Sequence, residues 1–183
     1  MGLKFVHEAK ANLQRSEVGT GPIAEGEFVV EQSDGTVRPF DPANDSLPHG
    51  IVVHYAEGDS IAEHDEDYFA NYDDLWTYAA GENLYWNPLS DVDRIMPKAI
   101  AEQSNPSSSE PDFGEGKVIG VVALGSGETR VVPEGYTYDG VTYGESGAGD
   151  FVSVGRMEDY PQNLRIQTAY DQRIPIRLDA DLF

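Results

Sequence analysis

The side chains most able to carry chemistry in this sequence are histidines and acids, so the first question is whether they could hold a metal ion. His49 and His54 are five residues apart across a strand that begins at Gly50. Successive side chains of a strand point to opposite faces, so this odd spacing argues against joint ligation. His64 precedes the run Asp65-Glu66-Asp67, which lacks the glycine and the spacing of a calcium-binding loop. We interpret that run as a solvated surface.

A second possible site is the loop Asp41-Pro42-Ala43-Asn44-Asp45-Ser46, where two acids could bind calcium and Asn44 heads an Asn-x-Ser glycosylation signal. A turn capped by Asx side chains explains the same residues without a ligand. Carboxylate pairs for glycoside hydrolysis cannot be singled out, because 33 acids make nearly every pairing available by chance. The sequence therefore predicts no catalytic, cofactor-binding or metal-binding residue, and an acid-dependent hydrolase is only a third interpretation.

The balance of charge is the most informative feature of the composition. The chain of 183 residues has 33 acidic and 12 basic residues, a formal net charge of -21, and no cysteine. A small soluble domain usually carries a net charge of about 2 to 8 in magnitude. The self-repulsion of a larger charge is tolerated when ~1 M salt shortens the screening length to about 3 Å. Because 39% of the residues are hydrophobic, disorder is disfavoured, and we interpret the charge as adaptation to molar salt.

Composition also excludes several classes of partner and chemistry. The absence of cysteine excludes disulfides, zinc-thiolate sites and thiol catalysis. No basic stripe is visible in the sequence, which predicts that the protein does not bind nucleic acid. No apolar run has the length of a transmembrane helix, and the first residues lack the pattern of a secretory leader. We therefore expect a soluble protein without a membrane partner.

Strand and turn signals dominate the elements that would position any site. Three hairpins are predicted, the first around Ser33-Asp34-Gly35, the second around Gly125-Ser126-Gly127 and the third around Asp139-Gly140. Consecutive hairpins joined by glycine and proline predict an all-β fold, a compact β-barrel or sandwich. The segment 59–80 fits a short amphipathic helix and an alternating strand equally well.

One phrase of the sequence occurs twice. The first copy runs Ala24-Glu25-Gly26-Glu27-Phe28-Val29-Val30 and continues to Gly50-Ile51-Val52-Val53. The second runs Ala80-Gly81-Glu82-Asn83-Leu84-Tyr85-Trp86 and, after a long loop, Gly116-Lys117-Val118-Ile119-Gly120-Val121-Val122. The repetition predicts two similar units that pack as equivalent halves of one core, with Phe28 and Leu84 at matching inward positions.

These phrases, together with Ala123-Leu124 and a final Thr129-Arg130-Val131-Val132, resemble the small head-decoration proteins of tailed viruses of bacteria and archaea. The resemblance covers roughly residues 19–132. It implies a compact β-barrel-like fold that binds the outer capsid surface, with the major capsid protein as partner, often as a homo-oligomer, with a trimer favoured. With the charge, it suggests a virus of a halophilic archaeon.

The resemblance also implies a division of the chain into an N-terminal arm (1–19), a decoration domain (20–134) and a C-terminal hairpin and tail (135–183). The arm is expected to contact the capsid through its apolar and basic residues, which are Leu3, Lys4, Phe5, Val6 and Lys10. The alternative interpretation is a carbohydrate-binding β module of a halophile. In that case the stacking platforms would be aromatic residues, which are Trp76, Trp86, Tyr136, Tyr138 and Tyr143.

Overall fold

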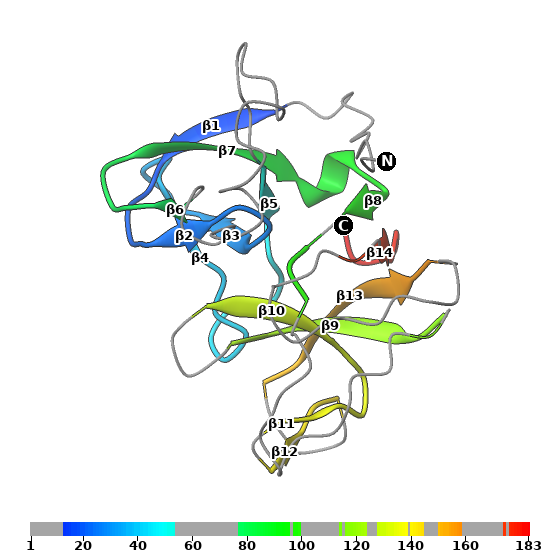
Figure 1. The fold of residues 1–183 in the computed structure, drawn as a ribbon. Helices are drawn as coiled ribbons and strands as arrows, with labels where there is room; N and C mark the ends of the chain where they lie inside the picture. Colours follow the sequence, from blue (N-terminus) through cyan, green and yellow to red (C-terminus); the bar gives the residue numbers. More distant parts are fainter. Residues whose placement is uncertain are drawn as a thin grey trace, which may run out of the picture.

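The structure is a computed structural model, and it describes residues 13–53, 77–95, 97–99, 114, 116–123, 128–138, 140–144, 150–158, 174 and 176–183. Within these residues the fold is built from strands, which confirms the predicted all-β class (Figure 1). A single 3-10 turn, η2 (Leu89–Asp91), is the one helical element that the described residues contain.

The first sheet has five strands and curls into a half-barrel. In spatial order the strands are β1 (Gln14–Glu17), β7 (Asn83–Pro88), β5 (Gly50–Val53), β3 (Phe28–Glu31) and β4 (Val37–Pro39). The curl brings the two outer strands together, because Val18, directly after β1, forms a parallel bridge with Val37 of β4. The backbone N–H of Gly19 donates to the carbonyl of Val37 at 2.8 Å at this closure. A short ribbon of β2 (Ile23–Ala24) and β6 (Thr77–Tyr78) is also antiparallel.

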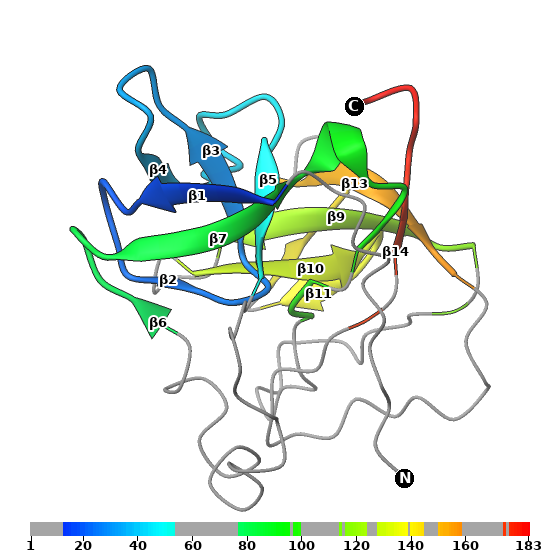
Figure 2. The same ribbon diagram turned by 90° about the horizontal axis from the view of Figure 1, so that it is seen from above.

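The second sheet also has five strands, and it lies under the first when the molecule is viewed from above (Figure 2). Its strands, in spatial order, are β10 (Thr129–Pro133), β9 (Val118–Ala123), β13 (Val152–Met157), β14 (Ile176–Leu178) and β8 (Arg94–Ile95). The hairpin of β11 (Thr137–Tyr138) and β12 (Val141–Thr142) projects from the side away from the first sheet (Figure 1).

Apolar side chains fill three layers. The interior of the first sheet holds Val18, Ile23, Val29, Val37, Val52, Leu84 and Trp86. The layer between the two sheets is the largest, and its members include Phe28, Phe40, Ile51, Ile119, Val131 and Ile176. A small third layer of Val122, Val132, Tyr136 and Tyr143 lies on the other face of the second sheet. Each sheet thus buries apolar side chains on both faces, and for this reason β3 and β5 contain almost continuous hydrophobic runs.

All three predicted hairpins are confirmed. β3 pairs with β4, β9 pairs with β10, and β11 pairs with β12, each antiparallel. In the first hairpin the carboxylate of Asp34 accepts from the backbone N–H and the hydroxyl of Thr36, at 3.0 and 2.7 Å, and Gly35 has a φ of 82°. A left-handed glycine of this kind is what the Asp-Gly pair predicts.

The repeated phrase begins with the same turn in both copies. In the first copy the backbone N–H of Ala24 donates to the carboxylate of Glu27 at 2.9 Å, and the backbone N–H of Glu27 donates to the carbonyl of Ala24 at 3.2 Å. In the second copy Ala79 and Glu82 form the same two hydrogen bonds, at 2.6 and 3.0 Å. The third residue is a glycine with a positive φ, 82° for Gly26 and 88° for Gly81. The sequence repeat therefore encodes a glutamate-capped turn that leads into a strand.

Beyond this turn the two copies fold differently, so the expectation of two equivalent halves is wrong. In the first copy β3 pairs with both β4 and β5. In the second copy β7 joins the first sheet between β1 and β5, whereas β8 and β9 lie in the second sheet, separated by β13 and β14. Phe28 and Leu84 are both buried, with 1% and 0% of their surface exposed. They nevertheless belong to different layers, because Phe28 lies between the sheets and Leu84 inside the first sheet.

Of the segment 59–80, whose helical or extended state the sequence left open, the structure describes residues 77–80, and Thr77 and Tyr78 form strand β6. Residues 59–76 lie outside the described part of the chain.

Candidate interaction surfaces

The five arm residues expected to contact a capsid lie outside the described residues, so their contacts stay a prediction. They are Leu3, Lys4, Phe5, Val6 and Lys10. The last residues of the 1–19 segment form β1, and Val18 is buried at 1% exposure. At the other end of the chain, β13 and β14 of the 135–183 segment are inner strands of the second sheet. Any truncation that is meant to leave the fold intact must therefore stop before β1.

Of the three histidines considered as metal ligands, the structure describes His49. His49 is exposed, and its Nδ1 accepts a hydrogen bond from the backbone N–H of Glu31 at 3.1 Å. His54 and His64 lie outside the described residues. No group of three or more histidine, aspartate or glutamate side chains in the described part of the chain has an arrangement that could hold a metal ion.

The loop at Asp41 is an Asx-capped turn closed by an ion pair. Asp41 accepts from the backbone N–H of Ala43 at 3.0 Å and from the side-chain amide of Asn44 at 2.6 Å. Arg38 donates through both Nη atoms to the two oxygens of Asp45, each at 2.6 Å. These hydrogen bonds hold the pKa of Asp45 below its usual value. The acids of this loop thus form the hydrogen bonds of the Asx-capped turn that the sequence predicted.

The aromatic residues proposed as sugar platforms are core residues where the structure describes them. Trp86 is 3% exposed, and its indole Nε1–H donates to Ser16 Oγ at 3.1 Å inside the first sheet. Tyr136 and Tyr143 are buried beneath the second sheet. Trp76 and the side chain of Tyr138 lie outside the described residues. These three buried rings therefore offer no open stacking face.

A buried ion pair connects the two sheets. Arg130 Nη1 donates to Glu27 Oε1 at 2.9 Å, and these side chains are 5% and 4% exposed. Glu27 Oε2 accepts from the backbone N–H of Ala24, and Arg130 also donates to the carbonyl of Thr129 at 2.8 Å. Lys98, which is 2% exposed, adds a second cationic group to the surroundings of Glu27.

Burial raises the pKa of Glu27 above 4.5, even though the backbone N–H of Ala24 and the cationic Arg130 and Lys98 act to lower it. Desolvation of the carboxylate thus outweighs the attraction to its partners. A group so enclosed cannot reach a substrate, so we assign the pair a role in joining the sheets.

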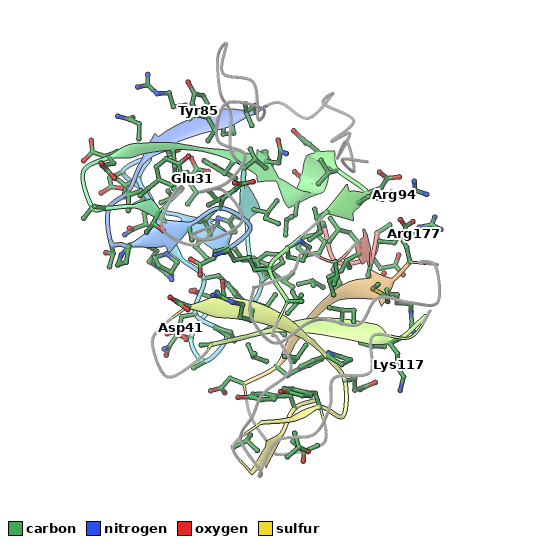
Figure 3. The ribbon with its side chains drawn as sticks, in the orientation of Figure 1. Glu31, Asp41, Tyr85, Arg94, Lys117 and Arg177 are labelled. Carbon is green, nitrogen blue, oxygen red and sulfur yellow. The ribbon has the colours of Figure 1, made fainter. Side chains whose placement is uncertain are left out.

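The clearest surface feature is a row of three arginines across the second sheet. Arg156 of β13 lies directly opposite Arg177 of β14, and Arg177 lies directly opposite Arg94 of β8. All three side chains are exposed, whereas Met157, Ile176 and Ile95, one position along each strand, are buried. The arginines therefore share the solvent face of these strands, about 5 Å apart from strand to strand. Arg94 and Arg177 extend from the same side of the molecule, where Lys117 also lies (Figure 3).

This row shows that the expectation of a chain without a basic stripe is wrong for the second sheet. In the sequence the three arginines are separated by 62 and 21 positions, and only the strand register brings them together. The sequence indicated only that Arg177 would be exposed, because Ile176-Arg177-Leu178 alternates as a half-buried strand does.

No protein-family model matches the sequence, and no curated protein or solved structure is significantly similar to it. Among the described residues, no helix is long and apolar enough to cross a membrane.

An open groove of about 720 Å³ lies on the first sheet, between its strands and the end of the chain. Its walls include Glu31, His49, Trp86, Pro88, Leu182 and Phe183. The groove mixes apolar surface with carboxylates, and the sequence did not predict it, because residues from five separate segments form its walls.

Proposed function

We propose that this protein is a structural component of a virion, a decoration protein that binds the outer surface of a viral capsid and stabilises it. The proposal rests on where the sequence segments that resemble decoration proteins lie in the fold. Gly50, Ile51 and Val52 of the first phrase pair in register with Pro88, Asn87 and Trp86 at the end of the second. The residues that carry the resemblance thus specify the central strands of the fold.

A structural role fits the way the chain uses its polar groups. In the described residues the buried charged groups Glu27, Lys98 and Arg130 are near one another, and the Glu27–Arg130 pair joins the turn before β3 to β10 of the second sheet. A protein of this kind acts by burying area against its neighbours, and an interface of about 1,600 Å² needs no catalytic motif. We therefore assign no reaction to it.

The arm is the proposed capsid-binding segment. It joins the fold at β1, which pairs with β7 on one side, and Val18 and Gly19, just after β1, contact Val37 of β4. Leu3, Phe5 and Val6 would supply apolar contacts, and Lys4 and Lys10 would supply positive charge. We propose a homo-oligomer, with a trimer favoured, on the capsid of a virus that infects a halophilic archaeon.

Co-sedimentation with undecorated capsids tests this proposal. Full-length protein and a variant without residues 1–12, which leaves β1 intact, are mixed with capsids at ~3 M KCl, where long-range repulsion is screened. We expect the full-length protein to sediment with the capsids and the truncated protein to bind at least about tenfold more weakly. The variant K4Q/K10Q is the matched control that separates the charge of the arm from its apolar residues.

Equal sedimentation of the two proteins would exclude the arm as the binding segment. Failure of both to sediment would contradict the capsid assignment. The carbohydrate-binding alternative would then be tested through Trp76 and Tyr138, since Trp86, Tyr136 and Tyr143 are core residues.

A further inference from the structure

We propose that Arg94, Arg156 and Arg177 form a docking surface for the carboxylates of an acidic partner protein. This inference rests on the proposed function, in which the partner is the capsid subunit beneath the protein.

The first reason is that three positive charges lie side by side in a chain that is otherwise strongly acidic. Of the 12 basic residues three stand at directly opposed positions of neighbouring strands, which leaves 12 − 3 = 9 for the rest of the chain against 33 acids. Like charges directly opposite each other destabilise a pair of strands. A sequence selected for stability alone, with so many acids available, would place acids between these arginines. The row is therefore a local exception that a binding role explains.

The second reason is that the described residues use few of the donors in the row. Arg94 Nε forms an ion pair with Glu158 Oε1 at 2.9 Å, and Arg156 Nη1 donates to the carbonyl of Gly116 at 3.2 Å. The guanidinium of Arg177, in the middle of the row, makes no hydrogen bond or ion pair with any described residue. Because each guanidinium carries five N–H donors, most of the donors stay available to a partner.

The third reason concerns the type of side chain. At ~1 M salt the screening length is about 3 Å, so attraction between separated charges is lost and direct contacts remain. A guanidinium forms two parallel hydrogen bonds to one carboxylate, whereas a lysine ammonium acts as a point charge. Three arginines therefore suit contact with carboxylates in concentrated salt. An acidic partner in the same solvent would supply those carboxylates, and the row would let two surfaces of like net charge approach each other.

The test compares capsid binding of the wild-type protein with that of R94Q/R156Q/R177Q, using the full chain at ~3 M KCl. K117Q is the matched control, because it removes one positive charge from an exposed position near the row but outside its register. R94K/R156K/R177K keeps the charge and removes the guanidinium fork. Circular dichroism of each variant verifies the fold. Poly-L-glutamate and polyphosphate at equal charge concentration serve as competitors.

We expect the glutamine variant to bind at least about tenfold more weakly, the lysine variant to be intermediate, and K117Q to bind like the wild type. Poly-L-glutamate should displace the protein more effectively than polyphosphate. Equal binding of the wild type and a folded glutamine variant would overturn the inference and leave the proposed function standing. A loss in K117Q as large as in the triple variant would also overturn it. Stronger displacement by polyphosphate would assign the row to phosphate polyanions instead.

If the wild-type protein binds no capsid, the proposed function fails and the inference is decided separately. The wild type and the glutamine variant are then applied to immobilised poly-L-glutamate at the same salt concentration. Retention that depends on the three arginines supports a carboxylate-binding surface, and equal behaviour of the two proteins overturns it.

Discussion

Glu27 and Arg130 are 103 residues apart in the sequence, and their 2.9 Å ion pair joins the turn before β3 of the first sheet to β10 of the second sheet, with both side chains almost fully buried. Glu27 also caps the turn 24–27, so one carboxylate connects a local turn to a long-range contact. Glu82 caps the matching turn 79–82 from an exposed position. The buried pair is therefore the principal difference between two turns with the same backbone hydrogen bonds.

Removal of Arg130 should destabilise the protein strongly, because it leaves the Glu27 carboxylate buried without its partner. We expect Arg130→Met to cost about 3 to 5 kcal/mol of unfolding free energy at pH 7, and Glu27→Gln in the same chain to restore most of it. Arg38→Met is the control, because Arg38 is 31% exposed and a pair so accessible to solvent is worth at most about 1 kcal/mol. Denaturant unfolding of the four proteins gives the values, and equal costs at positions 38 and 130 would contradict the burial argument.

The stability of the protein should depend on pH through Glu27. Its pKa in the folded state is raised above 4.5 by burial, so the stability it contributes is fully present below pH 4.5 and is lost as the pH rises through the raised pKa. Relative to the wild type, Glu27→Gln should therefore gain stability as the pH increases from 4.5 to 7.

Asp45 affects the pH dependence of stability in the opposite direction to Glu27 and in a lower pH range. Its pKa is lowered from 3.8, so the stability it contributes is present above pH 3.8 and is lost as the pH falls through the lowered pKa. Unfolding measured between pH 4.5 and 7 thus separates the two groups, with Glu82→Gln as the matched change in the exposed turn. A constant difference between the wild type and Glu27→Gln across this range would contradict the raised pKa.

Gly50 should tolerate no side chain, because the ring of Trp86 lies against its Cα. A Cβ at position 50 would overlap the six-membered ring of Trp86 and would lie 2.8 Å from the backbone oxygen of Asn87. We expect Gly50→Ala to cost about 1 to 3 kcal/mol by overpacking. The same substitution in a Trp86→Leu chain should cost less, because the ring is gone. Thermal unfolding of the four proteins tests the coupling, and an equal cost in both chains would show that the ring is not the obstacle.

Folding should require concentrated salt, because a charge of -21 repels itself over distances that dilute buffer does not screen. Circular dichroism melts at ~0.1 M and ~3 M KCl compare the two regimes. For a chain of this size each kcal/mol of relieved repulsion, taken at the melting temperature, raises that temperature by about 2 to 4 °C. Equal melting temperatures would contradict the interpretation as adaptation to molar salt.

The parts of the fold that the sequence predicted are those that local residues determine. The sequence pairs Asp34-Gly35 and Asp139-Gly140 favour tight turns, so the hairpins β3–β4 and β11–β12 could be placed from the turn residues alone. The repeated phrase was visible for the same reason, since Gly26 and Gly81 set the same positive φ in both turns.

Strand pairing over long distances could not be predicted in this way. The hydrophobic runs of β5 and β9 fit either sheet, because both sheets are buried on both faces. The arginine row depends on the pairing of β8, β13 and β14, and the Glu27–Arg130 pair depends on how one sheet lies on the other. A single acid among 33 gives no signal that it alone will be buried.

The central claim is that the protein stabilises a capsid, and the most direct measurement is the temperature at which undecorated capsids disrupt. Capsids at ~3 M KCl are heated with increasing amounts of the full-length protein, and release of their contents is followed by fluorescence. Because a ligand that binds only the intact state stabilises it, the disruption temperature should rise with protein concentration and level off when the sites are full. A disruption temperature that stays unchanged at saturating protein would contradict the account.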